Sequence, residues 1–412
     1  MSQWTPEWQL QINGVSYTNL TLANLTIVSG RTDIYSQPRA GYATVEIINL
    51  NLTPITIDVN DGLSIRVKNS AGTFVDIFGG NITDSIVEVS STGTGGINES
   101  IKITALGALA KLPKTLTEGV LSKDYDGNQI YTILSAALFN TWAEVPAALT
   151  WATYDPTTTW ANAENSGLGE IDRPGDYELM ARTADATDMY SLVSALATSG
   201  LGYIYEDAQG RIGYADSTHR SQYLAANGYT ILSANDALAA GIKTIRRLGD
   251  LRNQVTIQWR SGDITATDQA SIDQYGSQAS IIATTLHNSA DATLQANFYL
   301  GIRAYPQDVF DSITFSLGNS EIDDSDRDVL LNVFMGLPLD ITDLPSNMVN
   351  GRFEGFVEGW TFRAGYNRLD LILNVSPTAF SLQSMQWDDV SVTETWDTIS
   401  NTLDWNSAII VA

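Results

Sequence analysis

The sequence contains no cysteine, two histidines and only 22 basic residues against 47 acidic ones. Without cysteine the chain has no disulfide, no thiol nucleophile and no cysteine-ligated zinc, as expected of a protein made in a reducing cytoplasm. No apolar run approaches the roughly 18 residues that a membrane-spanning helix needs, so we expect no membrane insertion. The first seven residues, MSQWTPE, have neither a basic region nor an apolar stretch, and we expect no signal peptide.

Catalytic motifs are also missing. His219 and His287 lie far apart in the sequence, in loops where we expect surface histidines, and a nucleophilic triad would need one of them beside an activated serine. There is no Gly-x-Ser-x-Gly elbow, no His-Glu-x-x-His motif, no P-loop and no dinucleotide fingerprint. The sequence therefore predicts no catalytic residue and no cofactor.

The carboxylates allow two more specific interpretations. Asp324, Asp326 and Asp328 have the spacing of the first ligands in a calcium loop, but the glycine and the closing glutamate of that loop are missing. We interpret residues 321–328 as a solvated loop or a helix N-terminus, and we predict no metal site. Glu354 and Glu358 could form a glycosidase pair, an interpretation that only their presence supports.

The formal net charge of −25 argues against a protein that grips DNA, because DNA binding depends on neutralisation of phosphates by Lys and Arg. Such a surface could line a passage through which DNA slides without sticking. Alternatively, it keeps an abundant protein soluble. Charge alone leaves both interpretations open.

The order of predicted elements indicates a mainly β, α+β chain of several domains. Residues 1–113 read as a meander of strands, with alternation on both sides of the Asp61-Gly62 pair predicting a hairpin over 55–67. In 114–240 we predict helices over 130–142 and 188–199, the second ending at Gly200 in a left-handed cap, followed by a hairpin over 203–214. Strands return over 241–383, with a third helix from Ser289. We thus expect two antiparallel β-barrel or sandwich domains flanking a smaller α+β domain.

Tryptophan recurs with a spacing of nine residues in two short stretches. One interpretation is that these rings pack on their own domains. The other is docking, because Trp is enriched among interface anchors, and residues 384–412 would then be a docking tail. The partner-docking candidates are Trp142, Trp151, Trp160, Trp387, Trp396 and Trp405.

A basic cluster stands out in this acidic chain. Its residues are Lys243, Arg246, Arg247 and Arg252, with Arg260 nearby. In such a chain the cluster favours contact with an acidic neighbouring subunit over contact with nucleic acid.

Several segments, in order and with matching spacing over residues 1–383, resemble the tail-hub and minor tail proteins of long-tailed phages. They are 41–50 (GYATVEIINL), 78–84 (FGGNITD), 103–107 (ITALG), 253–257 (NQVTI), 271–276 (SIDQYG), 355–359 (GFVEG) and 373–377 (LNVSP). Each segment alone is ordinary strand-and-turn sequence, so their order carries the resemblance. The tail after residue 383 is not covered.

The resemblance implies two tail-tube-like β domains, residues 1–113 and 241–383, around the middle domain. Three chains would supply six such domains, so a homotrimer could form a baseplate-hub ring that continues a six-fold tube. The implied partners are the tail tube, distal tail protein and tape measure on one side and tip or fibre proteins on the other, in a virion made in the host bacterial cytoplasm. DNA would pass through the ring without being bound.

Two other functions stay open. A carbohydrate- or receptor-binding tail protein would use the Trp and Tyr rings as stacking platforms. A depolymerase would use Glu354 or Glu358.

Overall fold

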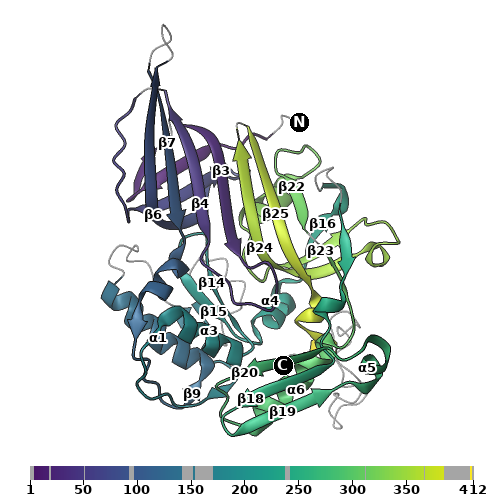
Figure 1. The fold of residues 1–412 in the computed structure, drawn as a ribbon. Coiled ribbons are helices and arrows are strands. Elements are labelled where there is room, and N and C mark those ends of the chain that lie inside the picture. The colour runs from purple at the N-terminus through teal and green to yellow at the C-terminus, as the bar shows by residue number, and fades with distance from the viewer. Residues whose placement is uncertain are drawn as a thin grey trace.

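The computed structural model describes residues 4–17, 20–50, 52–91, 97–141, 152–153, 170–236, 242–310, 312–365, 367–384 and 409–410. The fold is mainly β (Figure 1). The helices gathered at one end are α1 (Asp126–Thr141), α3 (Met189–Ser199), α4 (His219–Asn227), α5 (Gln269–Tyr275) and α6 (Ser289–Arg303). None of the helices in the described part of the chain has the length and apolarity that crossing a membrane requires.

The first β unit is an antiparallel sheet folded into two layers. Its strands are β1 (Trp8–Ile12), β2 (Val15–Tyr17), β3 (Thr21–Gly30), β4 (Tyr42–Asn49), β5 (Gly62–Lys68), β6 (Phe74–Ser91) and β7 (Ile97–Leu106). Strand β6 spans both layers, because its first half pairs with β5 and its second half with β7. Alternating residues such as Val45, Ile65 and Ile103 fill the space between the layers.

The hairpin expected over 55–67 is wrong in its first half. Strand β5 begins at Gly62 as expected, but residues 55–59 are not a strand. The alternation there has another cause, since Ile55 and Ile57 pack against the core without a ladder partner.

The second β unit lies beside the first. It consists of β16 (Thr230–Ser233), β17 (Thr244–Arg246), β21 (Asp308–Phe310), β22 (Ile313–Ser316), β23 (Pro338–Thr342), β24 (Phe353–Gly365) and β25 (Arg368–Pro377), with α7 (Asp324–Leu331). Strand β24 pairs with β25 on one edge and with β3 of the first unit on the other. One continuous layer, β6-β7-β4-β3-β24-β25, therefore crosses both units (Figure 1).

Below the shared sheet lies the α+β part. It contains α1 (Asp126–Thr141), α3 (Met189–Ser199), α4 (His219–Asn227) and the hairpin of β14 (Tyr203–Glu206) and β15 (Ile212–Ala215). Short strands connect these elements: β8 (Leu116–Thr117), β9 (Asp124–Tyr125), β10 (Ala152–Thr153), β11 (Glu170–Ile171), β12 (Glu178–Leu179) and β13 (Thr187–Asp188). Helix α3 starts where Asp188 accepts a hydrogen bond from Ser191 N, as an N-cap does.

The cap expected at the end of α3 forms one residue later. Gly200 has a φ of −88°, whereas Leu201 takes the left-handed conformation with a φ of 55°. A Cβ at Gly200 would lie 2.5 Å from both Asp126 Oδ2 and Tyr214 Oη. Glycine stands here because of this close approach rather than because of its backbone freedom.

Residues 254–303 form a layer that packs with the α+β part. They contain β18 (Gln254–Trp259), β19 (Gly262–Thr267), α5 (Gln269–Tyr275), β20 (Ala279–Ala283) and α6 (Ser289–Arg303). Val255, Ile257 and Leu286 belong to the same buried cluster as Leu134 and Val193. This layer is inserted between β17 and β21, inside the second β unit.

The third predicted helix exists as α6, and Ile302 is among its buried residues. Leu294 and Tyr305 are exposed, while Ala292 and Ala296 are buried against β18 and β19. Small residues allow the helix to approach the sheet closely, and hydrophobicity alone did not reveal that requirement.

The remaining elements are short. They are the 3-10 helices η2 (Ala108–Lys114), η3 (Ala234–Asp236), η4 (Leu248–Asp250), η5 (Val349–Gly351) and η6 (Thr378–Phe380), and the paired strands β26 (Gln383–Ser384) and β27 (Ile409–Ile410). Among the described strands the main sheet runs from β16 to β2 without closing into a barrel.

Candidate assembly surface

The two β units repeat one topology. Antiparallel pairing of β3 with β4, β4 with β7, β5 with β6 and β6 with β7 has its counterpart in β17 with β21, β22 with β25, β23 with β24 and β24 with β25. In the second unit, β21 and β22 together correspond to β4. The chain therefore carries the same β unit twice.

The repeat extends to individual residues. The β6–β7 ladder shifts register between Ile82 and Asp84, and the β24–β25 ladder shifts between Val357 and Gly359. In each unit the shift comes one residue after the last pair of the preceding hairpin, which involves Asn81 in β6 and Phe356 in β24. Asp84 of the first unit thus corresponds to Gly359 of the second.

The two units meet at the edge of β24. Residues 359–364 pair with residues 25–30 of β3, with Gly359 opposite Gly30 and Ala364 opposite Leu25. Trp360, Phe362 and Ala364 point into the core there, at 3%, 1% and 6% exposure. This junction shows how one β unit buries the strand edge of another.

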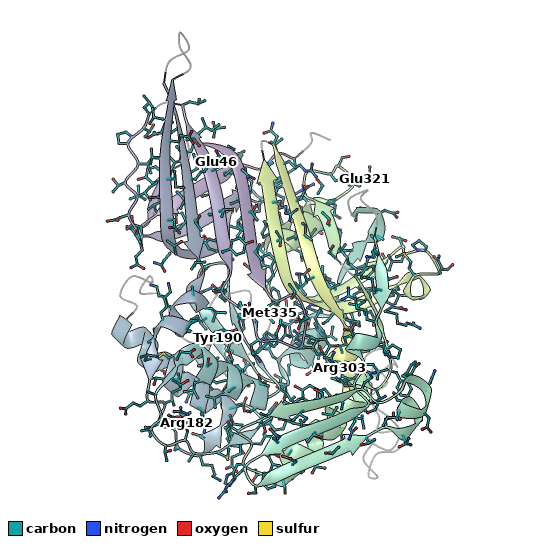
Figure 2. The ribbon with its side chains drawn as sticks, in the orientation of Figure 1. Glu46, Arg182, Tyr190, Arg303, Glu321 and Met335 are labelled. Atoms are coloured by element: carbon teal, nitrogen blue, oxygen red, sulfur yellow. The ribbon has the colours of Figure 1, made fainter. Side chains whose placement is uncertain are left out.

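One face of the shared layer is polar and carries no helix (Figure 1). A row of directly opposed residues crosses it: Asp370, Arg363, Thr26, Thr44, Thr104 and Asp84. Glu46 lies on the same face (Figure 2) and forms an ion pair of 3.8 Å with Lys102. Within this row, three threonines separate Arg363 on one side from Asp84 on the other.

A buried ion network holds the two β units on the α+β part. Glu358, 1% exposed, accepts hydrogen bonds from Arg31 Nε at 2.7 Å and from Arg220 Nη1 and Nη2 at 2.8 and 2.9 Å. Burial alone would raise the pKa of Glu358, but the charges of Arg220 and Arg31 lower that pKa to about 2. Arg31 follows β3, Arg220 lies on α4 and Glu358 on β24, so the network fixes three elements together.

Solved structures of phage tail proteins are similar to this chain over most of its length. The chain is similar in structure to the prophage MuSo2 43 kDa tail protein from Shewanella oneidensis, with a TM-score of 0.56 and 11% identity over 91% of this chain and 99% of that one. It is also similar to the tail protein from Neisseria meningitidis MC58, with a TM-score of 0.60 and 9% identity over 92% of this chain and 98% of that one. The chain has the fold of phage tail proteins.

At these identities the likeness is one of fold, and at that level it confirms the resemblance predicted from the sequence. No protein-family model and no curated protein matches the sequence.

Within this tail-protein fold, three residues of the predicted basic cluster lie together. Lys243, Arg246 and Arg247 are exposed on or beside β17, where Arg246 pairs with Asp308 at 2.8 Å. Arg252 lies apart, with its guanidinium carbon 5.7 Å from the centre of the Tyr35 ring. All six tryptophans predicted to dock a partner lie outside the described residues, so their role stays a prediction.

The histidine and carboxylate predictions have mixed outcomes. His219 is not at the surface: it is 2% exposed, and its Nδ1 lies 2.9 Å from Asp172 Oδ2. The acidic run is a helix N-terminus as expected, because Asp323 caps α7 by accepting from Asp326 N. Among the described residues, no group of three or more His, Asp or Glu side chains is placed to hold a metal ion.

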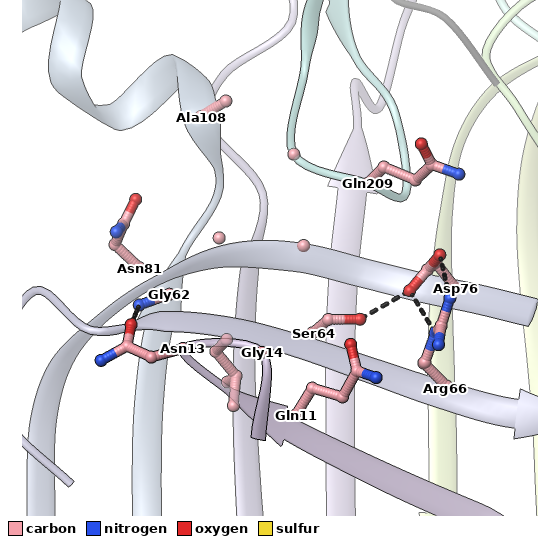
Figure 3. Close-up of a pocket in the computed structure, with 14 residues that line it drawn as sticks. Gln11, Asn13, Gly14, Gly62, Ser64, Arg66, Asp76, Asn81, Ala108 and Gln209 are labelled. Atoms are coloured by element: carbon pink, nitrogen blue, oxygen red, sulfur yellow. Dashed lines mark hydrogen bonds and ion pairs between the residues drawn. The ribbon is translucent and has the colours of Figure 1, made fainter. Parts of the chain in front are cut away.

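The two carboxylates that could form a glycosidase pair, Glu354 and Glu358, bind different arginines. Glu358 is buried in its arginine network, whereas Glu354 pairs with Arg352 at 3.0 Å. Neither carboxylate lines the cleft of about 590 Å³ between β5 and the β14–β15 turn (Figure 3).

That cleft is polar. Ser64 and Arg66 both hydrogen-bond to Asp76 in it (Figure 3), and none of the described residues that line it carries an aromatic ring. It therefore offers no stacking platform for a sugar.

The residues that sequence reasoning missed are the ones that join segments distant in sequence. Arg31 and Arg220 contact Glu358 across 327 and 138 positions. A sequence signal existed only for Glu358, as a charged residue that directly follows the apolar pair Phe356 and Val357.

Proposed function

We propose that this chain is a structural subunit of a phage tail, and that three copies form a hub ring that continues the six-fold tail tube. The observation that supports this most directly is the internal repeat. Each chain carries two equivalent β units joined edge to edge through β3 and β24, so three chains supply the six units that a six-fold tube requires.

The polar face of the shared sheet would line the channel. Glu46, Asp84, Glu88 and Asp370 give this face one more acidic than basic residue, the basic ones being Lys102, Arg363 and Arg368. Negative charge repels DNA phosphates, and threonines offer them no cationic contact, so DNA would pass without being bound.

The ring would connect the tail tube, distal tail protein and tape measure to the tip or fibres. The α+β part and residues 254–303 lie at one end of the shared sheet and would contact components on that side (Figure 1). The tryptophans of residues 384–412 would anchor a neighbour, as Trp commonly does at interfaces. The protein would act in the virion rather than as an enzyme.

The mass of the purified chain in solution tests the ring. Three copies of the 44.7 kDa chain give 134.1 kDa, which light scattering distinguishes from a monomer. Negative-stain electron microscopy should show rings with a central hole. A stable monomer at every concentration up to about 100 μM would contradict the proposal, since ring interfaces of standard size reach micromolar affinity or better.

A further inference from the structure

One strand edge of the first β unit lacks the cover that its counterpart has. Residues 84–89 of β6 correspond to residues 359–364 of β24, and all six are exposed. Val87 and Val89 occupy the positions of Phe362 and Ala364, yet they are 56% and 61% exposed against 1% and 6%. Within the described residues, this half of β6 pairs only with β7.

A matching strand exists at the far side of the second unit. Strand β17 pairs with β21 as β3 pairs with β4, so β17 is the counterpart of the strand that covers β24. Within the described part of the chain β17 pairs with β21 alone. Each chain thus presents one uncovered edge and one strand of the kind that covers it.

The internal junction also gives the register. Ile103 pairs with Ser85, and Leu373 pairs with Trp360, so Ile103 and Leu373 are equivalent. Their partners Val45 and Ile313 are then equivalent too.

Tyr42 stands three residues before Val45 and pairs with Val28. Phe310 stands three residues before Ile313 and pairs with Thr244. Thr244 therefore corresponds to Val28, and Arg246 corresponds to Gly30. Because Gly30 pairs with Gly359, and Gly359 corresponds to Asp84, this places Arg246 opposite Asp84.

We propose that β17 of one copy pairs antiparallel with residues 84–89 of the next copy, with Arg246 opposite Asp84, Ile245 opposite Ser85 and Thr244 opposite Ile86. We call this contact the seam. It rests on the proposed ring and specifies how one subunit binds the next. The seam repeats between chains the junction that β3 and β24 make within each chain.

Charge at the two edges is complementary. Asp84 and Glu88 are exposed on the β6 edge, while Lys243, Arg246 and Arg247 are exposed on or beside β17. Arg246 already binds Asp308 through its Nε and Nη2 atoms, so in the seam it lies between two aspartates. Opposite charges directly across an antiparallel pair stabilise it, and like charges destabilise it. The apolar Val87 and Val89 become buried at the same time.

Disulfide trapping tests the register, because the chain has no cysteine of its own. Directly opposed residues of an antiparallel pair have Cα atoms about 4.5–5.5 Å apart, within the span of a disulfide. We expect the double variant Ser85→Cys with Ile245→Cys to form covalent dimers and closed covalent trimers on oxidation. The matched control, Ile86→Cys with Ile245→Cys, should not, because neighbouring strand residues point to opposite faces. Each single-cysteine variant controls for random collisions.

The outcomes separate the seam from the ring. A 134.1 kDa particle with covalent trimers only in the first variant supports both. A particle of that mass without covalent trimers, or with equal trapping in the control, overturns the seam and leaves the ring. A monomer without covalent multimers overturns both.

Charge reversal gives a second measurement. Asp84→Lys should raise the dissociation constant of the trimer about tenfold, because it faces Arg246 across the seam. Asp263→Lys changes the net charge equally on the exposed strand β19, and we expect a change within about twofold. Equal effects of the two variants would overturn the proposed pairing of Asp84 with Arg246.

Discussion

Glu358 is the residue on which the relative placement of the three parts depends. Its carboxylate also accepts from Ser376, and it neutralises two arginines that are each less than 10% exposed. Removing one member of such a network leaves a buried charge without a counter-charge. The stability lost in this way exceeds the net stability that the intact network contributes.

The variant Glu358→Gln should lower the free energy of unfolding by about 3–5 kcal/mol, because Arg31 and Arg220 then stay buried without a counter-charge. Denaturant titration of the purified chain measures this. Glu354→Gln is the matched control four residues earlier on the same strand, where the partly exposed side chain pairs with Arg352. There the change should stay within about 1 kcal/mol. Similar losses in both variants would show that the buried network has no special role.

The pKa of Asp126 is shifted upward, whereas that of Glu358 is shifted downward. It is fully buried, and this burial raises its pKa from 3.8 to about 8 despite hydrogen bonds from Tyr214 and from Tyr177 N. The folded chain therefore holds a proton that the unfolded chain releases, so this residue makes stability fall as pH rises from about 4 to about 8.

Asp126→Asn keeps the side-chain shape and removes the titration. Between pH 5 and pH 8 the unfolding free energy of the variant should fall less steeply than that of the wild type, by up to about 1.4 kcal/mol per pH unit. Denaturant titrations at each pH measure the two slopes. Identical slopes would mean that Asp126 is ionised in the folded chain at pH 5.

At the scale of elements, the joint between the β14–β15 hairpin and the first β unit depends on close packing at glycines. Glu206 at the end of β14 accepts hydrogen bonds from Gly41 N and from Leu109 N at 2.9 Å. A Cβ at Gly107 would lie 2.2 Å from the Glu206 carboxylate, so glycine leaves the space that the carboxylate fills.

Gly107→Ala should therefore displace Glu206 and destabilise the chain by about 1–3 kcal/mol, as overpacking does. Gly107 has a φ of −67°, so the backbone itself tolerates alanine. Gly249→Ala is the control, because a Cβ there meets nothing within 4 Å. Melting temperatures of the two variants compare them, and an unchanged value for Gly107→Ala would contradict the packing argument.

Elements defined by local pattern could be predicted from the sequence, and contacts between distant elements could not. The spacing of apolar residues after Asp188 predicted α3, and the turn at residues 207–210 predicted the β14–β15 hairpin. The pairing of β3 with β24 joins residues more than 300 positions apart, and many strands in the chain have a compatible alternation. The basic residues of β17 were found from composition, but the β6 edge was missed, because its exposure is visible only beside its buried counterpart in β24.

At the scale of the whole molecule, long-range repulsion and local attraction compete. Each chain has a formal charge of −25, so a ring of three carries −75. The Debye length falls from about 30 Å at 0.01 M salt to about 8 Å at 0.15 M, so repulsion between whole subunits is screened first. Charge pairs in contact across the seam, a few ångströms apart, are screened much less.

We therefore expect the trimer to become tighter, not weaker, when salt rises from 0.01 to 0.15 M. Sedimentation velocity at a fixed micromolar concentration of the chain measures the trimer fraction at each salt concentration. Asp263→Lys makes each chain less negative by two charges without changing the seam. It should weaken this salt dependence, because it reduces the repulsion between subunits. Asp84→Lys makes each chain less negative by the same amount but removes the carboxylate that faces Arg246 across the seam. Its trimer should therefore stay weaker than that of Asp263→Lys at every salt concentration. A trimer that dissociates as salt rises would mean that local ion pairs outweigh the net charge of −25 per chain.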